Sequence, residues 1–285
     1  MPHRYRRLLN SISLAIVALV ATAIGADSPR RSSGVKSHPD RVVEADDETF
    51  RPTVMIVKGK GQGSGSVIAS VDRETLVLTA AHVVREPGDL VVELHRYNVG
   101  AEHANTPGTW PRIVRAEVVA ADAPSDVAVI RIEGMVALPY VARLAEPDET
   151  PEKGAVVTSV GIDQATHLSS WTARVYGVYA LDPLKRGTKR PFLITDHAPE
   201  HGRSGGGLYR SDGRLVGLCV GRSDPPKGHA IGCFAPVTSI HRLLRENDLE
   251  AAIARSERGH VAADHTARPS VRNPVTTTGH RQSDR

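Results

Sequence analysis

Aromatic residues and cysteine are both scarce in this chain of 285 residues. With only three Phe, two Trp and six Tyr residues, the core has to be built mainly from Val, Ile, Leu and Ala. Two cysteines are too few for a disulfide framework or for a four-cysteine zinc site. Apolar residues make up 40% of the sequence and charged residues 24%, a balance that excludes a wholly disordered or fibrous protein.

Acidic residues are missing from the first 26 residues, where a basic head with Arg4, Arg6 and Arg7 precedes an apolar run from Leu8 to Ile24. A basic head, an apolar run and small residues at its end are typical of an export signal. Polar residues interrupt the run, which makes it a poor permanent membrane span. We therefore expect residues 1–26 to be a signal peptide, with an N-terminal anchor as the alternative. The protein is then exported to the periplasm or the cell exterior.

The rest of the chain divides by composition into three parts. Residues 27–43 are rich in Ser, Pro, Arg and Gly and predict a linker, and the polar residues 255–285 predict a disordered tail. Basic residues concentrate at these ends, and the block 44–254 is mildly acidic, so we expect no nucleic-acid partner. The block shows no long internal repeat and is expected to be one domain.

Short runs of Val, Ile and Thr recur between turn residues throughout this block. They lie at Thr53–Val57, Ser64–Ala69, Thr75–Thr79, Leu90–Leu94, Ile113–Ala120, Val127–Ile132, Ala155–Val160, Thr172–Tyr179, Phe192–Thr195, Leu215–Val220 and Ala230–Pro236. Such strands, with glycine-marked turns and no alternating helices, predict an all-β barrel or sandwich. Ile240, Leu243 and Leu244 then recur at helical spacing, which predicts a C-terminal helix capped by Thr238 or Ser239.

Two segments place a chemically useful side chain at the end of an expected strand. In L-V-L-T-A-A-H-V-V, His82 follows a strand that ends at Thr79 and has small alanines beside it. In S-D-V-A-V-I, Asp126 leads into an apolar strand, and a carboxylate buried there needs a donor such as an imidazole N–H. Taken alone, each segment also fits a surface histidine or a turn-capping aspartate. Asp122 competes with Asp126, but it lies outside the apolar alternation.

A third segment, G-R-S-G-G-G-L at residues 202–208, surrounds Ser204 with glycines. A nucleophilic serine needs a tight turn in which nearby N–H groups point into one small space, and glycines permit that backbone. The amides of Gly202 and Ser204 could then bind a developing oxyanion. The alternative is a flexible Gly/Ser loop, which predicts no partners elsewhere in the chain.

The three motifs occur in the order His, Asp, Ser, and together they resemble the chymotrypsin-like serine peptidases over nearly all of residues 50–245. The segment G-Q-G-S-G-S-V-I, the pair Thr195–Asp196 and the closing G-C-F-A-P-V are similar to the bacterial HtrA/Deg branch. The resemblance implies two six-stranded antiparallel β-barrels with the active site in the cleft between them. It places His82 and Asp126 on the first barrel and Ser204 on the second.

The same resemblance implies the chemistry of a serine-type endopeptidase acting on proteins or peptides. Ser204 would attack the peptide carbonyl, His82 would pass its proton to the leaving amine, and Asp126 would hold the imidazole. The amides of Gly202 and Ser204 would bind the oxyanion, and an acyl-enzyme on Ser204 would be the intermediate. No metal or organic cofactor is implied.

Three features depart from the family pattern. Arg203 stands where trypsin-like enzymes carry Asp and HtrA/Deg enzymes carry Asn. It argues against activation by a new N-terminus, and it could distort the oxyanion loop if it lacks an acidic or carbonyl partner. Gly207 replaces the usual proline, which predicts a looser turn. The stretch after the last expected helix is too short and polar for a PDZ domain, so we expect no PDZ ligand.

The resemblance also locates a specificity pocket, with Ala198 at its floor. Its walls are expected to come from Leu218, Cys219, Val220 and residues 231–233. Because no acidic residue falls at the floor, we expect small to medium aliphatic side chains before the scissile bond rather than Lys or Arg. The loop His197–His201 could reshape this pocket.

Cys219 and Cys233 lie on strands that are expected to be neighbours. In an exported protein they could form a disulfide, and two buried free thiols are the alternative. Two other functions stay open beside the endopeptidase. One is a pseudoprotease that binds peptides or a protein partner, which Arg203 keeps open, and the other is an esterase using the same chemistry.

Overall fold

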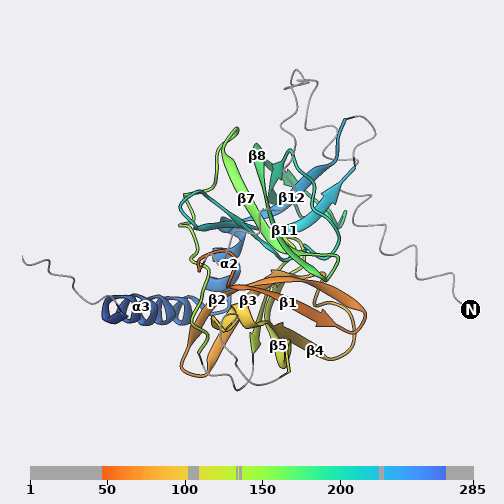
Figure 1. Ribbon diagram of the computed structural model, residues 1–285. Coiled ribbons are helices and arrows are strands. Elements are labelled where there is room, and N and C mark those ends of the chain that lie inside the picture. The colour runs from red at the N-terminus through yellow and green to blue at the C-terminus, as the bar shows by residue number, and fades with distance from the viewer. Residues whose placement is uncertain (1–46, 102–108, 133, 135–136, 225–227, 268–285) are drawn as a thin grey trace, which may run out of the picture.

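A computed structural model describes residues 47–267 apart from 102–108, 133, 135–136 and 225–227. The expected signal peptide and linker lie outside these residues. Two barrels are stacked on one another, with one helix at their junction and a second helix extending to the side (Figure 1). The expected all-β fold of two six-stranded antiparallel barrels is confirmed. No helix in the described ranges has both the length and the apolarity needed to cross a bilayer.

The two barrels have the same topology. The first contains β1 (Thr53–Lys58), β2 (Gly61–Val71), β3 (Glu74–Ala80), β4 (Leu90–Leu94), β5 (Arg112–Asp122) and β6 (Val127–Ile132). The second contains β7 (Val156–Asp163), β8 (His167–Leu181), β9 (Arg190–Thr195), β10 (Gly207–Tyr209), β11 (Leu215–Ser223) and β12 (Ile231–Pro236). The sheets close in the orders β1-β2-β3-β6-β5-β4 and β7-β8-β9-β12-β11-β10. Each barrel therefore repeats one Greek-key path and leaves no open sheet edge.

One strand of the second barrel, β10, escaped the sequence analysis. It has three residues, too few for a period-2 pattern to be seen. Gly207 begins it and pairs with Val160 of β7 and Leu218 of β11. The expected looser turn at Gly207 is therefore wrong, because both neighbouring strands fix its backbone. A Cβ at this position would lie 2.4 Å from the Tyr209 ring, so the ring would have to move to admit a larger residue.

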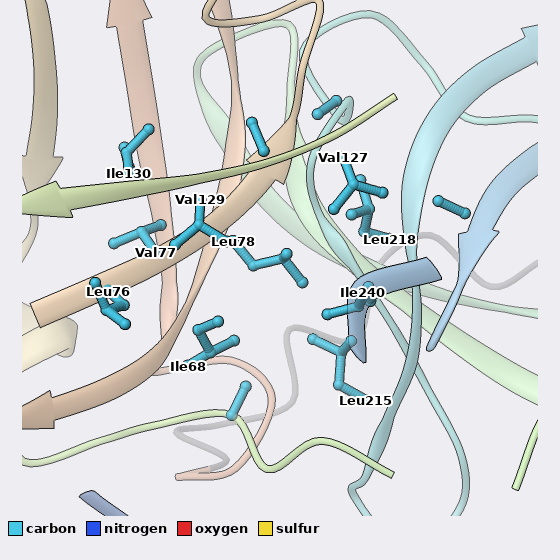
Figure 2. Packing of buried hydrophobic residues seen from close by; sticks show 14 of the residues in the cluster. Ile68, Leu76, Val77, Leu78, Val127, Val129, Ile130, Leu215, Leu218 and Ile240 are labelled. Carbon is cyan, nitrogen blue, oxygen red and sulfur yellow. The ribbon is translucent and has the colours of Figure 1, made fainter. Parts of the chain in front are cut away.

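The main hydrophobic cluster is built largely from aliphatic residues, as the scarcity of aromatic residues requires. It runs from Ile68 and Leu76 in the first barrel to Leu215 and Leu218 on β11 and to Ile240 on the helix α2 (Val237–Glu246) (Figure 2). Because interiors are close-packed, this shared cluster holds the two barrels and α2 in a fixed relation. Loops from the two barrels that lie at their junction are thus held in place by one shared core.

The helix α2 confirms the expected C-terminal helix, but its expected cap is wrong. Pro236 is the N-cap, in extended conformation, and no side-chain cap bond forms. Thr238 and Ser239 lie inside the first turn because the helix begins where β12 ends. The hydrophobic side chains Ile240, Leu243 and Leu244 are buried, as their spacing predicts.

A second helix, α3 (Glu250–Ala267), replaces the beginning of the expected disordered tail, so that expectation is wrong for residues 255–267. Its packed face combines Ile253, partly buried against the main cluster, with small or polar residues. This weak apolar pattern explains why the segment was not read as an amphipathic helix. Ala252 and Ser256 are buried, and the Ser256 hydroxyl accepts a hydrogen bond from the backbone N–H of Ser70 at 2.8 Å. His260 lies on the same face, near the carbonyl oxygen of Leu138 at 3.3 Å.

Candidate active site

Sheet register brings His82 and Asp126 together at one end of the first barrel. Strands β3 and β6 pair antiparallel with Ala80 opposite Val127. The backbone N–H of Ala81 donates to the Asp126 carbonyl at 3.1 Å, which extends the pairing by one step. His82 and Asp126 therefore emerge side by side just beyond the strand ends.

The Asp126 carboxylate binds His82 through both oxygens. Oδ2 lies 2.6 Å from His82 Nδ1, and Oδ1 accepts the His82 backbone N–H at 2.8 Å. Because a carboxylate only accepts, Nδ1 carries the hydrogen and Nε2 is left as the basic nitrogen. The Asp126 side chain is 8% exposed and that of His82 28%, so the acid is shielded and the imidazole reaches solvent. Asp126 has a left-handed backbone with φ of 57°, a conformation that aspartate tolerates better than most residues.

The competing carboxylate, Asp122, is engaged elsewhere. Its Oδ2 lies 2.5 Å from Nη2 of Arg242 on α2 and 3.8 Å from Nε of Arg190. Arg242 also donates to the Ser125 hydroxyl at 2.6 Å. Asp122 therefore links α2 to the first barrel, whereas Asp126 alone contacts His82 among the described carboxylates.

The loop that carries Ser204 docks against strands of the first barrel. The Ser204 carbonyl accepts the backbone N–H of Ser64 on β2 at 2.8 Å. A Cβ on Gly205 would lie 2.1 Å from the Ser64 carbonyl oxygen and 2.9 Å from the Ala80 amide nitrogen. Only glycine permits this approach, and Ala80 is two residues before His82. The Ser204 hydroxyl donates to the Val220 carbonyl at 3.3 Å.

Hydrogen bonds fix the two peptide groups that carry the amides of Gly202 and Ser204. The His201 carbonyl accepts the backbone N–H of Gln164 at 2.6 Å, and the Arg203 carbonyl accepts that of Gly206 at 2.8 Å. In a trans peptide the following N–H points away from the carbonyl, so each of these bonds fixes the direction of the amide that follows it, that of Gly202 or that of Ser204. Neither of these two amides donates a hydrogen bond within the described residues. Both are available to bind an oxyanion.

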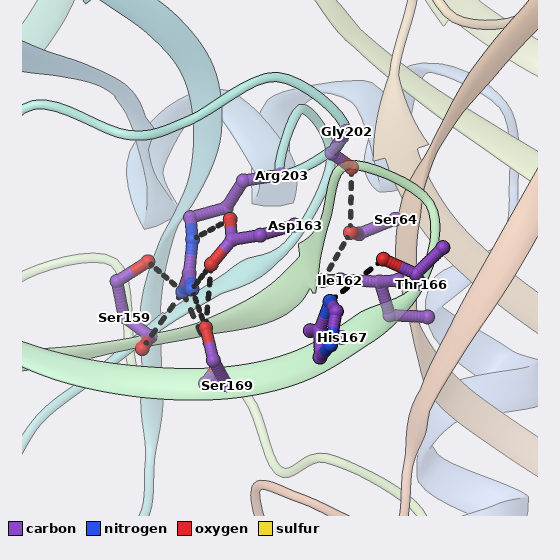
Figure 3. A network of polar contacts seen from close by, with 9 residues as sticks. All are labelled: Ser64, Ser159, Ile162, Asp163, Thr166, His167, Ser169, Gly202 and Arg203. Atoms are coloured by element: carbon purple, nitrogen blue, oxygen red, sulfur yellow. Dashed lines mark hydrogen bonds and ion pairs between the residues drawn. The ribbon is translucent and has the colours of Figure 1, made fainter. Parts of the chain in front are cut away.

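Arg203 has the partners that its position requires. Its side chain is fully buried and forms an ion pair with Asp163, at the end of β7, at 2.5 Å (Figure 3). It also donates to the Ser159 carbonyl at 3.2 Å. The condition under which Arg203 could distort the oxyanion loop, the lack of an acidic or carbonyl partner, is therefore not met.

The residues expected around the specificity pocket differ in accessibility. Ala198 is partly exposed, whereas Leu218 and Cys219 expose no surface and Val220 exposes 5%. Cys219 packs with the second barrel's own core rather than with the cluster that contains Leu218 and Val220. In this structure a substrate side chain could touch Ala198, while Leu218 and Cys219 would have to move first. His197 stacks on Trp171, with ring centroids 4.3 Å apart.

Both cysteines are free and buried. A register shift between β11 and β12 places Cys219 opposite Phe234, and Cys233 opposite Gly221. Burial raises the pKa of the Cys219 thiol to about 12 and raises that of Cys233 well above its ordinary value. Of the two alternatives from the sequence, the structure shows buried free thiols.

Two contributors to this site were not found from the sequence. Ser64 bridges the barrels: its hydroxyl donates to the Gly202 carbonyl at 2.9 Å and accepts the Ile162 N–H at 2.8 Å. Asp163 holds Arg203 from 40 positions away. The glycine-serine segment was recognised as family-like, but nothing local marked Ser64 or Asp163 as structural partners of the Ser204 loop.

Comparison with known proteins agrees with this geometry. The family model described as the trypsin-like peptidase domain matches residues 63–218. The serine endoprotease DegS of Salmonella typhimurium is 27% identical over 223 residues, covering 75% of this chain and 56% of that protein. A probable periplasmic serine endoprotease, DegP-like, of Halomonas elongata is 27% identical over 169 residues, 55% of this chain and 28% of that protein. The chain spans about half the length, or less, of these curated relatives.

Solved structures share the fold. An inactive form of Rv3671c from M. tuberculosis has a TM-score of 0.57 at 22% identity and covers 77% of this chain and 96% of that one. The active form of the same protease has a TM-score of 0.56 at 20% identity, covering 77% and 93%. The resemblance to the HtrA/Deg branch that the motifs carry is confirmed by the curated relatives. Because the family model covers more than half of the sequence, the chain belongs to the trypsin-like peptidase domain family.

Proposed function

We propose that this protein is a serine endopeptidase that hydrolyses peptide bonds in proteins or peptides through Ser204, His82 and Asp126. The observation that carries the proposal is the contact between His82 Nδ1 and Asp126 Oδ2 at 2.6 Å, at the edge of the barrel where the Ser204 loop docks. That contact leaves Nε2 as the basic nitrogen of the His82 imidazole, whose side chain is partly exposed.

In the first half of the reaction, the Ser204 hydroxyl turns from the Val220 carbonyl toward His82 Nε2. Ser204 Oγ attacks the peptide carbonyl carbon as its proton passes to Nε2, and Asp126 stabilises the resulting imidazolium. The carbonyl oxygen becomes an oxyanion held by the amides of Gly202 and Ser204. The proton then moves from Nε2 to the leaving amine as the C–N bond breaks, which leaves an acyl-enzyme on Ser204.

In the second half, water repeats the attack. His82 takes a proton from the water, the hydroxide adds to the acyl carbon, and the same amides hold the oxyanion again. Collapse of this intermediate releases the carboxylic acid and returns the proton to Ser204 Oγ. The hydrogen bond between nucleophile and base is often absent or long before substrate binds. The bond from the Ser204 hydroxyl to the Val220 carbonyl is therefore compatible with these reaction steps.

We also propose export as the cellular setting. The relatives include proteins named as periplasmic serine endoproteases, and the first 26 residues have the basic head and apolar run of an export signal.

The specificity pocket, with Ala198 at its floor, favours small to medium aliphatic residues before the scissile bond.

A fluorophosphonate probe with the mature chain tests the proposal. We expect covalent labelling of Ser204 in the wild-type protein, no labelling of Ser204→Ala, and casein cleavage only by the wild type. Thermal unfolding of both proteins controls for folding. A folded wild-type protein that binds peptides but is neither labelled nor cleaves them would be a pseudoprotease. Cleavage of peptide esters without cleavage of matched amides would make it an esterase.

A further inference from the structure

A buried arginine directly precedes the proposed nucleophile, and its guanidinium is fully bonded. Arg203 Nε donates to Asp163 Oδ1 at 2.8 Å and Nη2 lies 2.5 Å from Oδ2. Nη1 donates to the carbonyls of Ser159 and Ser169 at 3.2 and 3.4 Å, and Nη2 also binds the Ser169 hydroxyl. All five N–H groups of the guanidinium therefore have an acceptor, and the Trp171 ring lies 5.0 Å from Cζ.

These bonds come from the β7–β8 hairpin, which also touches the backbone beside Ser204. The turn that follows Asp163 is made by Gln164 and Ala165, both with left-handed φ, at 51° and 57°. Two non-glycine residues in that conformation carry strain that the surrounding structure must offset. Gln164 uses its N–H to hold the His201 carbonyl. A Cβ on Gly202 would meet the turn at 2.8 Å from the Ile162 carbonyl oxygen and 3.0 Å from the Gln164 nitrogen.

The β7–β8 hairpin thus bonds both the side chain of Arg203 and the backbone that precedes it. The hairpin holds the guanidinium through Asp163, and it holds the peptide between residues 201 and 202 through Gln164. Ser64 of the first barrel holds the next peptide through the Gly202 carbonyl at 2.9 Å. Figure 3 shows the contacts of the Arg203 guanidinium with Asp163 and the contact of Ser64 with the Gly202 carbonyl. The peptide that carries the Ser204 amide is held by the bond from the Gly206 N–H to the Arg203 carbonyl at 2.8 Å. A rotation of any of these three peptides would break at least one bond.

A buried ion pair contributes little to net stability, because removing two charges from water costs about as much as their attraction returns. Well-packed apolar residues would fill the same space at comparable stability. The geometric specificity of the guanidinium fork distinguishes it from such residues, because it fixes both the position and the direction of its partners.

We infer that Arg203 and Asp163 are positioning residues, which hold the amides of Gly202 and Ser204 in the orientation that binds the oxyanion. This inference rests on the proposed function, since it names the residues that orient the oxyanion-binding amides of that site before substrate binds. The oxyanion loop is then held by an ion pair internal to the second barrel.

Kinetics of three variants test the inference. Arg203→Met removes the guanidinium, and Arg203→Met/Asp163→Leu removes both charges so that no carboxylate is left buried alone. We expect kcat to fall about 100-fold in both, the range seen when one oxyanion donor is lost, with KM changed less than about threefold because ground-state binding is untouched. Arg203→Lys keeps the charge but offers three donors without the fork, and we expect it to restore kcat only in part.

The matched control is Arg210→Met. Arg210 is also in the second barrel and pairs with Asp212 and Glu149, but it is partly exposed. Exposed pairs contribute little, so we expect its kcat and KM to match the wild type. Thermal unfolding of every variant identifies those that fail to fold, and the double variant is the decisive one because it leaves neither charge buried without its partner.

Hydrogen exchange supplies a readout that does not depend on catalysis. The amides of Gly205 and Gly206 donate to the carbonyls of Cys219 and Arg203, and we expect both to exchange faster in the double variant than in Arg210→Met. A double variant with wild-type kcat and wild-type exchange would overturn the inference. If the wild type is not labelled by fluorophosphonate, the proposed function fails, and the exchange rates alone still decide whether Arg203 and Asp163 hold the loop.

Discussion

The two barrels share one topology, but they fix their parts of the site by different means. In the first barrel, backbone register does the positioning: the pairing of β3 with β6 carries His82 and Asp126 to adjacent places. In the second barrel, Ser204 lies on a loop between β9 and β10, outside the paired strands. Isolated backbone bonds from Ser64, Cys219 and Gln164 reach this loop. Buried side chains add to them, chiefly Asp163 through Arg203 and Ser64 through the Gly202 carbonyl.

This difference follows from what each half must present. An acid and a base need one contact between two side chains, which two neighbouring strands can supply. An oxyanion site needs several backbone amides turned to the same side, and peptides in a loop can rotate unless their carbonyls are bonded. The same fold therefore supplies a ladder where register is sufficient and a network of buried polar groups where it is not.

The largest effect on kcat is expected when the contact between His82 and Asp126 in the first barrel is broken. In Asp126→Asn the amide can present an N–H to His82 Nδ1 and favours the wrong tautomer, so we expect kcat for peptide cleavage to fall about 10⁴-fold. Asp122→Asn is the matched control, because Asp122 contacts Arg242 rather than His82. Equal losses in the two variants would mean that the contact with His82 has no special role.

The second barrel can be followed separately, because it contains both cysteines. At pH 8, burial with a pKa of about 12 for Cys219 leaves a thiolate fraction about 10³-fold below that of an unfolded chain. We expect alkylation by iodoacetamide to be slowed at least that much in the native protein, measured by mass spectrometry.

Along a urea titration, alkylation should begin together with the loss of fluorophosphonate labelling, because one apolar cluster joins both barrels. Loss of labelling well before alkylation would show that the first barrel opens independently.

A glycine comparison measures how closely the second barrel's loop is held. Gly202 and Gly154 have nearly the same φ, 92° and 88°, but only Gly202 has atoms within 4 Å of an added Cβ. Alanine at either position costs about 1–2 kcal/mol of stability from the left-handed backbone. We expect Gly202→Ala to lower kcat about 100-fold in addition, because the β7–β8 turn must move away, and Gly154→Ala to leave kcat unchanged. A kcat loss shared by both would assign the effect to backbone strain alone.

The two halves also differ in how far the sequence predicted them. His82, Asp126 and Ser204 stand in short motifs whose order and strand context are visible along the chain, and the structure brings His82 into contact with Asp126. The partner of Arg203 was not predictable, since Asp163 reaches it from another hairpin. The turn after Asp163 was not predictable either. Its left-handed positions are usually occupied by glycine or asparagine, which mark a turn in the sequence, but here they are occupied by Gln164 and Ala165.

The errors at the C-terminal end have a related cause. The face of α3 that packs on the first barrel carries Ala252, Ser256 and His260 at helical spacing, with Ile253 beside them as a partly buried apolar residue. This is a weaker pattern than the apolar repeat that periodicity arguments look for. The cap of α2 was misplaced because Thr238 and Ser239 are favourable capping residues, whereas the continuous passage from β12 through Pro236 decided where the helix begins.

The smallest expected effect concerns the polar contact between α3 and the first barrel. In Ser256→Ala the buried backbone N–H of Ser70 loses its acceptor, which costs about 1–3 kcal/mol. We expect the free energy of unfolding in urea to fall by that amount, while kcat stays at the wild-type value because the contact is made by β2 and α3 rather than by the strand ends that hold His82 and Asp126. Glu257→Ala, the exposed neighbour on the same helix, should leave the unfolding free energy within about 0.5 kcal/mol of the wild type. Equal stability of the two variants would show that α3 lies against the barrel without stabilising it, and register within the barrel would then be sufficient to hold its half of the site.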